Sequence, residues 1–277
     1  MKSFFLSLVL CLFVCRTVMA QPEPYVWTSQ SANSSESMPC GGGDVGLNVW
    51  VERGEVLFYV CRSGSFDENN TLLKAGRWRI TLPEPLADDG FRQRLVLGSG
   101  YVDITDGRQT LTLWADVEKP VVHVEATCSK GGGKPLVVSY ESWRTAPRAM
   151  TRREGFQSSW KFAMPKSTVT SADTIRPAAD RLTFFHHNPR TTIFDATVAQ
   201  QQMETVKERL YNPIGNLISG GCMMGDGLIY INKVRARYAS ADYTAYRYES
   251  RGRGGRHHVQ IVFGASQESE LDFLSQI

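Results

Sequence analysis

Short runs of β-branched and aromatic residues, divided by Gly, Pro and Asp, follow one another from Val45 to Arg144. Such runs, with frequent turn residues between them, are typical of strands in sandwiches and barrels. The predicted strands cover residues 45–52, 55–62, 78–82, 93–97, 101–104, 110–117, 121–127 and 136–143. Helical patterns do not alternate with these runs, so the sequence favours an all-β, antiparallel domain over a parallel α/β sheet.

The second half of the chain is less regular. Residues 146–180 carry no strand or helix pattern, and we interpret them as a long excursion over the sandwich. Strand character resumes at 181–186 and returns at 227–232, 243–249 and 257–263, which read as closing strands.

One short inserted helix is predicted after the strand at 181–186. Thr197 and Gln200 have the spacing of a capping box, and apolar residues recur on one face from Ala199 to Leu210. The Asn212-Pro213 step stops this helix. A second helical pattern, at 266–277, places Leu271, Phe273 and Leu274 among polar residues. It has too few turns to be stable without a partner, so we expect it to be partly exposed and loosely held.

The N-terminus has the three parts of a secretory signal over residues 1–20. Lys2 is a short basic region, residues 4–14 are apolar, and Val18-Met19-Ala20 provides small residues before Gln21. The apolar run is shorter than the roughly 20 residues that span a bilayer, and no later segment is apolar enough to do so. The protein is therefore expected to be secreted or periplasmic, with no membrane span after cleavage.

Composition narrows the range of partners. Without Lys2 and Arg16 the formal net charge falls from +3 to about +1, which argues against nucleic acid as a partner. Cysteines 40, 61, 128 and 222 remain after cleavage, and their spacing matches no zinc motif. In an exported protein they could form one or two disulfides, but we expect buried thiols, because a domain this large needs no such staples.

A glycine-rich loop gives the clearest family signal. In NSSESMPCGGGDVGLNVWVE, residues 33–52, Gly41, Gly42 and Gly43 precede Asp44 and a strand. This stretch resembles the Pro-Leu-Gly-Asn-Gly-Asp-x-Gly signature of the family catalogued as domain of unknown function 5703, which contains secreted bacterial glycoside-hydrolase-like proteins. It departs from that signature at Cys40 and Gly42, where Leu and Asn would be expected.

Two further landmarks extend the resemblance over nearly the whole mature chain. GEVLFYVCRSGSFDENNTLLKAGRWRITL (54–82) resembles the second family landmark, and residues 182–228 resemble the third, a strand, a short helix and a Gly-rich return strand. The family is similar to the N-terminal supersandwich of α-L-fucosidases. The resemblance implies a galactose-mutarotase-like antiparallel β-supersandwich over 21–265. Residues 266–277 would then start a linker helix to a C-terminal helical-barrel domain that this chain lacks.

The resemblance also shapes the functional hypotheses. In the related fucosidases the catalytic acids and bases lie on the helical barrel, so this domain is expected to carry no catalytic residue, cofactor or metal. Its role would be to support the barrel and shape a glycan cleft. The close approach that glycines allow makes Ser37, Gly41, Gly42, Gly43 and Asp44 the candidates for substrate-adjacent residues. The alternative is a stand-alone secreted carbohydrate-binding protein.

A third hypothesis is a mutarotase-type sugar isomerase. His123 and Glu125 lie two apart on a predicted strand and share one face, as an acid/base pair in a sugar cleft would. The simpler explanation is a solvent-facing pair whose strand buries its other face. Two residues specify no geometry, and this hypothesis ranks last.

Other candidate motifs have ordinary explanations. His186-His187-Asn188 could offer a metal ligand, but adjacent strand residues point to opposite faces, so a polar strand end is preferred. Asp67-Glu68-Asn69 and Asp88-Asp89 are best explained by turn chemistry, since glycosidase carboxylates usually come from separate segments. The Arg/Gly run at 251–256 predicts a basic hairpin tip, and most of the six tryptophans are expected in the core.

Overall fold

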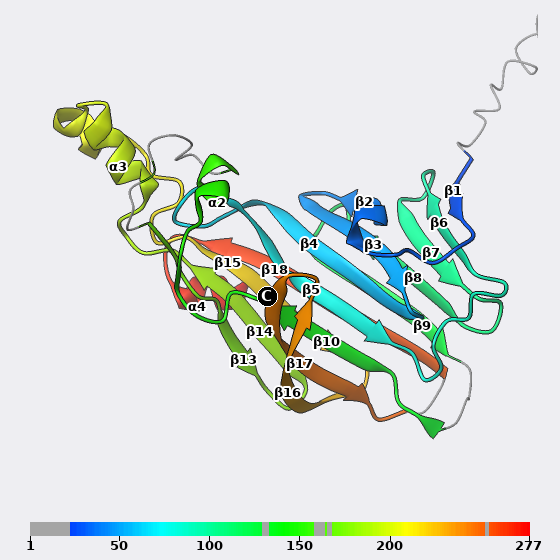
Figure 1. Cartoon of the computed structure of the whole chain (residues 1–277). Helices are drawn as coiled ribbons and strands as arrows, with labels where there is room; N and C mark the ends of the chain where they lie inside the picture. The colour runs from blue at the N-terminus through cyan, green and yellow to red at the C-terminus, as the bar shows by residue number, and fades with distance from the viewer. Residues whose placement is uncertain (1–22, 129–132, 158–163, 165–167, 253–254) are drawn as a thin grey trace, which may run out of the picture.

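The computed structural model describes residues 23–128, 133–157, 164, 168–252 and 255–277. Two large antiparallel sheets pack face to face as a sandwich, and the labelled short helices lie together on the left-hand side of the view (Figure 1). The all-β antiparallel prediction is therefore confirmed. The predicted signal peptide, 1–20, lies outside the described residues.

One sheet has seven strands in the order β16-β17-β10-β5-β4-β3-β2. Its strands are β2 (Met38–Gly42), β3 (Val45–Glu52), β4 (Glu55–Phe66), β5 (Leu72–Thr81), β10 (Val137–Ser142), β16 (Leu228–Tyr238) and β17 (Ala241–Ser250). Hairpin turns join β2 to β3, β3 to β4 and β4 to β5, so the middle of this sheet follows chain order. β10 and the β16–β17 hairpin join it from distant parts of the sequence.

The other sheet has nine strands in the order β1-β6-β7-β8-β9-β18-β15-β14-β13. Its strands are β1 (Tyr25–Trp27), β6 (Arg92–Val96), β7 (Tyr101–Thr105), β8 (Thr110–Ala115), β9 (Val121–Cys128), β13 (Thr174–Pro177), β14 (Arg181–His187), β15 (Ile218–Gly225) and β18 (Gly255–Ser266). The segment 146–180 is less irregular than predicted. It also holds β11 (Arg148–Ala149) and β12 (Val169–Thr170), which pair with each other, and α2 (Arg152–Gln157).

The core lies between the sheets and follows the two-residue period of the strands. On β4, Phe58 and Val60 are fully buried between the sheets, and Phe58 stacks on Trp78 of β5 with ring centroids 5.7 Å apart. Phe184 of β14 and Phe263 of β18 meet Trp78 from the facing sheet, at 5.5 and 6.2 Å. The intervening residues of each strand point outward, so each sheet also has an outer face that does not contribute to the core.

The predicted helix after β14 was placed about five residues too late. Helix α3 runs over Ile193–Gln200, and its capping box consists of Thr192 and Asp195 instead of Thr197 and Gln200. A 3₁₀ helix, η3 (Glu204–Arg209), follows it. Thr192 caps because its extended backbone lets its hydroxyl accept the Phe194 amide, whereas Thr197 lies inside the helix and donates to the Ile193 carbonyl.

The C-terminal helix packs on this domain. β18 continues through Ser266, so helix α4 covers only Glu270–Ser275. Phe273 is fully buried against Phe185 and Ile218 of the nine-stranded sheet, while Leu271 is 79% exposed. Phe273, which belongs to a helical pattern predicted to need a partner, thus packs on the sandwich itself. The loose attachment predicted for this segment, and the domain boundary at 265/266, stay predictions. No helix in the described part of the chain has the length and apolarity needed to cross a bilayer.

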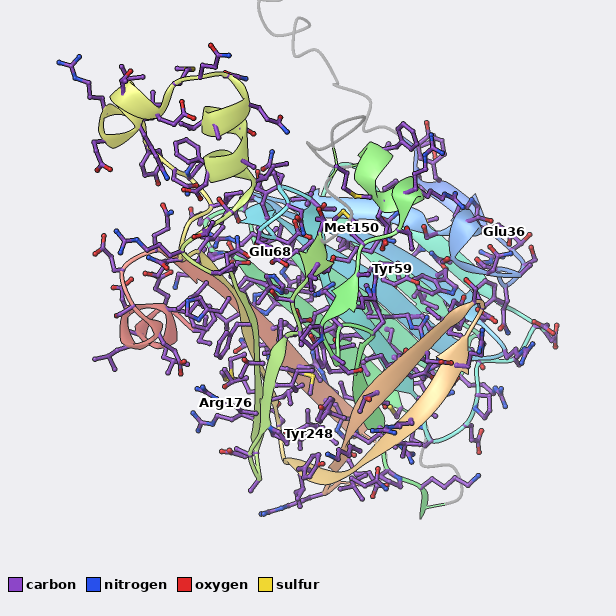
Figure 2. All side chains as sticks on the ribbon, turned by 60° about the vertical axis from the view of Figure 1, so that its left-hand side comes forward. Glu36, Tyr59, Glu68, Met150, Arg176 and Tyr248 are labelled. Carbon is purple, nitrogen blue, oxygen red and sulfur yellow. The ribbon has the colours of Figure 1, made fainter. Side chains whose placement is uncertain are left out.

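The β16–β17 hairpin forms one edge of the seven-stranded sheet and also reaches over its outer face. It extends beyond its pairing with β10, and its tip folds back over the outer face of that sheet. Tyr238, near the tip, donates a hydrogen bond of 2.7 Å to Glu52 on β3, although four strands of the sheet lie between β16 and β3. In Figure 2 the hairpin can be followed from the labelled Tyr248, near its base, to this tip.

Candidate functional site

A pocket of about 480 Å³ lies on the outer face of the seven-stranded sheet. We call it the sheet pocket, and its volume is within the range of ligand-binding cavities. Strands β4 and β5 form its floor, the tip of the β16–β17 hairpin forms one wall, and the segment after β10 forms another. The lining residues used below are Tyr59, Lys74, Arg77, Trp143, Tyr238 and Tyr243.

Aromatic rings dominate the floor and walls of the sheet pocket. Tyr59 and Trp143 meet edge to face, with ring centroids 6.0 Å apart and an interplanar angle of 85°. Tyr59 also packs on Trp50, which points outward from β3 and is covered by Tyr59 at 5.0 Å and by Tyr238 at 6.4 Å. Tyr59 and Trp143 remain half-buried, so parts of both rings are accessible from the pocket.

Charged groups lie between these rings. The Arg77 guanidinium is 3.9 Å from the Tyr238 ring centre and 4.8 Å from that of Tyr243, and it pairs with Glu141 on β10. Arg77 and Glu141 are both almost fully buried beneath the hairpin tip. The Lys74 ammonium lies 4.2 Å above the Tyr59 ring. Cations held over aromatic faces are stabilised by the ring quadrupole.

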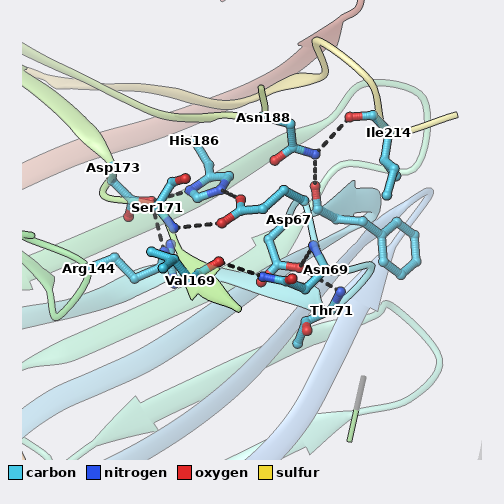
Figure 3. Close-up of polar contacts among 12 residues, drawn as sticks. Asp67, Asn69, Thr71, Arg144, Val169, Ser171, Asp173, His186, Asn188 and Ile214 are labelled. Atoms are coloured by element: carbon cyan, nitrogen blue, oxygen red, sulfur yellow. Dashed lines mark hydrogen bonds and ion pairs between the residues drawn. The ribbon is translucent and has the colours of Figure 1, made fainter. Parts of the chain in front are cut away.

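A buried ion network supports one end of the sheet pocket (Figure 3). His186 at the end of β14 is 2% exposed and lies between two carboxylates. Its Nε2 is 2.9 Å from Glu68 and its Nδ1 is 3.0 Å from Asp173. Asp173 also accepts from Nε of the pocket residue Arg144 at 2.8 Å, and Glu68 accepts from the Ser171 amide at 2.6 Å. The network therefore joins four separate segments of the chain, around residues 68, 144, 171–173 and 186.

His186 is an imidazolium in this network. Ionised carboxylates only accept hydrogen bonds, so both ring nitrogens must donate. Burial alone would lower the pKa of His186, but the hydrogen bonds to Asp173 and Glu68 outweigh it and raise that pKa to about 9. In Glu68, burial is outweighed by the bond from His186 together with backbone amides and the charge of His186, and in Asp173 by the charges and hydrogen bonds of Arg144 and His186 together. The pKa of each carboxyl therefore lies below its ordinary value.

The turn between β4 and β5 connects this network to the sheet pocket. Asp67 accepts the backbone amides of Asn69 at 3.0 Å and Thr71 at 2.7 Å, as turn chemistry predicts. Burial raises the pKa of Asp67, and the nearby Glu68 raises it further, against the lowering effect of those amides. The Thr71 hydroxyl, in the pocket wall, is buried without a hydrogen-bond partner among the described residues, which is uncommon for a buried hydroxyl.

The five residues predicted from the glycine loop lie on β2 and at its two ends. Ser37 precedes β2, and Gly41, Gly42, Gly43 and Asp44 form the end of β2 and its turn into β3. None of the five lines the sheet pocket. A Cβ at Gly42 would stand 2.4 Å from the Ala115 carbonyl oxygen, so this glycine is needed for close packing on the chain's own backbone. The role of these residues beside a ligand stays a prediction.

The histidine and glutamate of the isomerase hypothesis lie on the other sheet. His123 and Glu125 share the outer face of β9, as predicted. His123 stacks between Trp114 at 4.8 Å and His258 at 5.3 Å, and its Nδ1 is 3.1 Å from His258 Nε2. Burial and the neighbouring His258 lower the pKa of His123. Neither His123 nor Glu125 lines the sheet pocket.

Simple packing accounts for the positions of the remaining histidine and cysteine motifs. His186 and His187 point to opposite faces, one buried and one exposed. Cysteines 40, 61, 128 and 222 are all free thiols. Among the described residues, no three or more His, Cys, Asp or Glu side chains are grouped to hold a metal ion. Part of the 251–256 run and Trp160 lie outside the described residues.

Two features of the site were missed by sequence reasoning. Glu68 was assigned to turn chemistry, but it pairs with a histidine 118 residues away, and no local pattern signals that contact. The hairpin tip was missed because the strand prediction ended at residue 232, whereas β16 continues to Tyr238. Residues on both faces of this extension are exposed, so it lacks the buried apolar face that a periodicity analysis detects.

The fold and the pocket together define a two-sheet antiparallel β-sandwich with an aromatic and charged pocket on the outer face of one sheet. The model of the N-terminal domain described as "Domain of unknown function (DUF5703)" matches residues 26–277. The chain therefore belongs to this family. Its description names no activity, and no curated protein matches the sequence.

Proposed function

We propose that this DUF5703 domain binds a saccharide in the sheet pocket. In this proposal it is the non-catalytic N-terminal β-sandwich of a secreted glycoside-hydrolase-like protein. The observation that carries the proposal is the pocket itself, in which the partly exposed rings of Tyr59 and Trp143 stand beside the exposed Lys74 and above the buried pair of Arg77 and Glu141. Aromatic faces suit the apolar faces of sugar rings, and nearby polar groups suit their hydroxyls.

The carboxylates of the pocket favour binding over hydrolysis. Glycosidases need a pair of carboxyl groups placed on either side of the scissile bond. Among the described lining residues, Asp67 is occupied by backbone amides of its own turn, and Glu154 is occupied by Arg148 and Thr151. A supporting role for a helical-barrel domain rests on the likeness to the fucosidase sandwiches. The stand-alone carbohydrate-binding alternative would use the same pocket.

Substitution of the two accessible rings tests this proposal. With the tightest saccharide of an oligosaccharide panel, Trp143→Ala and Tyr59→Ala are each expected to weaken binding about tenfold or more, since buried aromatic contacts dominate binding energy. Isothermal titration calorimetry gives the dissociation constants. The matched control is Trp114→Ala, which removes a half-buried tryptophan from the other sheet and should leave affinity unchanged.

Three results would contradict the proposal in whole or in part. If no saccharide binds, or if only Trp114→Ala reduces binding, the sheet pocket is not the site. Turnover of aryl glycosides by the purified protein, retained after repurification, would overturn the non-catalytic assignment.

A further inference from the structure

The cations of the sheet pocket differ in whether their charge is already neutralised. Arg77 pairs with Glu141, Arg144 with Asp173, and Arg148 with Glu154. Each of these guanidiniums therefore has a carboxylate in contact, and two of the three, Arg77 and Arg144, are buried. Their remaining capacity to attract an anionic ligand is small, because the nearest opposite charge belongs to the protein.

Lys74 is the exception in the described lining. Its ammonium pairs with no carboxylate among the described residues and lies over the Tyr59 ring at 4.2 Å. The two carboxylates of the lining do not neutralise it, since Asp67 is directed at the amides of Asn69 and Thr71, and Glu154 at Arg148. An exposed ammonium beside two accessible rings is thus available to a ligand.

From this arrangement we infer that the saccharide bound in the sheet pocket is acidic, with a uronate carboxylate received by Lys74. This inference rests on the proposed saccharide-binding function and deepens it. A sugar ring against Tyr59 and Trp143 would bring a ring carboxylate close to the ammonium held above Tyr59. The resulting charge-assisted hydrogen bond is stronger than one to a neutral hydroxyl. A neutral sugar would use the same rings without this bond.

Matched pairs of ligands separate the two cases. Oligomers of galacturonate, glucuronate and mannuronate are compared with galactose, glucose and mannose oligomers of the same length and linkage, by calorimetry at low ionic strength. At least one uronate oligomer should bind about fivefold tighter than its neutral partner, the size expected for one partly exposed charged hydrogen bond. The preference should shrink at about 1 M salt, where exposed charges are screened.

Substitution of the lysine assigns the preference to this group. Lys74→Gln should abolish the uronate preference, because it should weaken uronate binding much more than neutral binding, and Lys74→Arg should retain most of the preference. Lys119→Gln is the control, because Lys119 is another exposed lysine, in the turn between β8 and β9.

The outcomes distinguish this inference from the proposed function. If uronate and neutral oligomers bind equally, or if Lys74→Gln keeps the preference, the acidic-sugar inference is wrong and saccharide binding stands. If no oligomer of either kind binds, the proposed function fails and the inference fails with it.

Discussion

Replacing His186 with alanine is expected to lower the free energy of unfolding by about 3–5 kcal/mol. The imidazolium is 2% exposed and donates to Glu68 and Asp173, so its loss leaves Glu68 with no charged partner among the described residues and Asp173 with Arg144 alone. Buried charges that have lost their partner account for a loss of stability of this size. Urea unfolding followed by tryptophan fluorescence measures the change.

The neighbouring histidine provides a matched control for this substitution. His187 is exposed on the opposite face of β14, and His187→Ala should change stability by no more than about 0.5 kcal/mol. A loss below about 1 kcal/mol for His186→Ala would show that the network around Glu68 and Asp173 does not stabilise the fold.

The ion network around His186 also makes the stability of the fold depend on pH. The pKa of His186 is raised from 6.5 to about 9 in the folded protein. The stabilisation that protonated His186 gives the fold is therefore complete below pH ~6.5 and is lost as the pH rises towards ~9. This loss lowers the free energy of unfolding by about 3 kcal/mol. The carboxyls act in the opposite sense, because the lowered pKa values of Glu68 and Asp173 cost stability as the medium becomes acidic. The alkaline loss should be absent from His186→Ala.

Replacing Phe273 with alanine should also have a large effect, with a loss of about 3 kcal/mol. The ring is fully buried, 5.4 Å from the ring of Phe185, and it anchors a helix of only six residues. A helix this short has little stability without its packing, so it should detach in the variant and exchange its amides quickly.

Leu271→Ala is the control for this experiment. Leu271 lies on the same helix but is 79% exposed, and its loss should leave both stability and amide exchange unchanged. If Phe273→Ala had no larger effect than Leu271→Ala, the C-terminal segment would be as loosely held as its sequence predicts.

The strands were predictable because their signals are local. The 45–52 prediction coincides with β3, since its alternating apolar residues and the Arg53-Gly54 turn lie within a few positions of one another. Capping was less predictable, because Thr192 with Asp195 and Thr197 with Gln200 both satisfy the same short pattern. Only the extended backbone at Thr192 decides between them.

The sheet pocket was not predictable from this sequence. The bond between Tyr238 and Glu52 spans 186 residues, and the contact between His186 and Glu68 spans 118. Both depend on how the β16–β17 hairpin and the loops meet after the sheets have packed. The glycine loop drew attention to residues 37–44 because its pattern is local, whereas the structure needs Gly42 for close packing against the Ala115 backbone.

The most direct test of saccharide binding in the sheet pocket is a nuclear magnetic resonance titration of the indole N–H groups with the tightest saccharide found. Binding in the sheet pocket predicts a saturable shift of the indole signal of Trp143, which lines that pocket, with no shift of the buried Trp78. Assignment follows from the signals missing in Trp143→Phe and Trp78→Phe. A saturable shift confined to Trp114, on the outer face of the other sheet, would contradict it, as would an unmoved Trp143 signal at saturation.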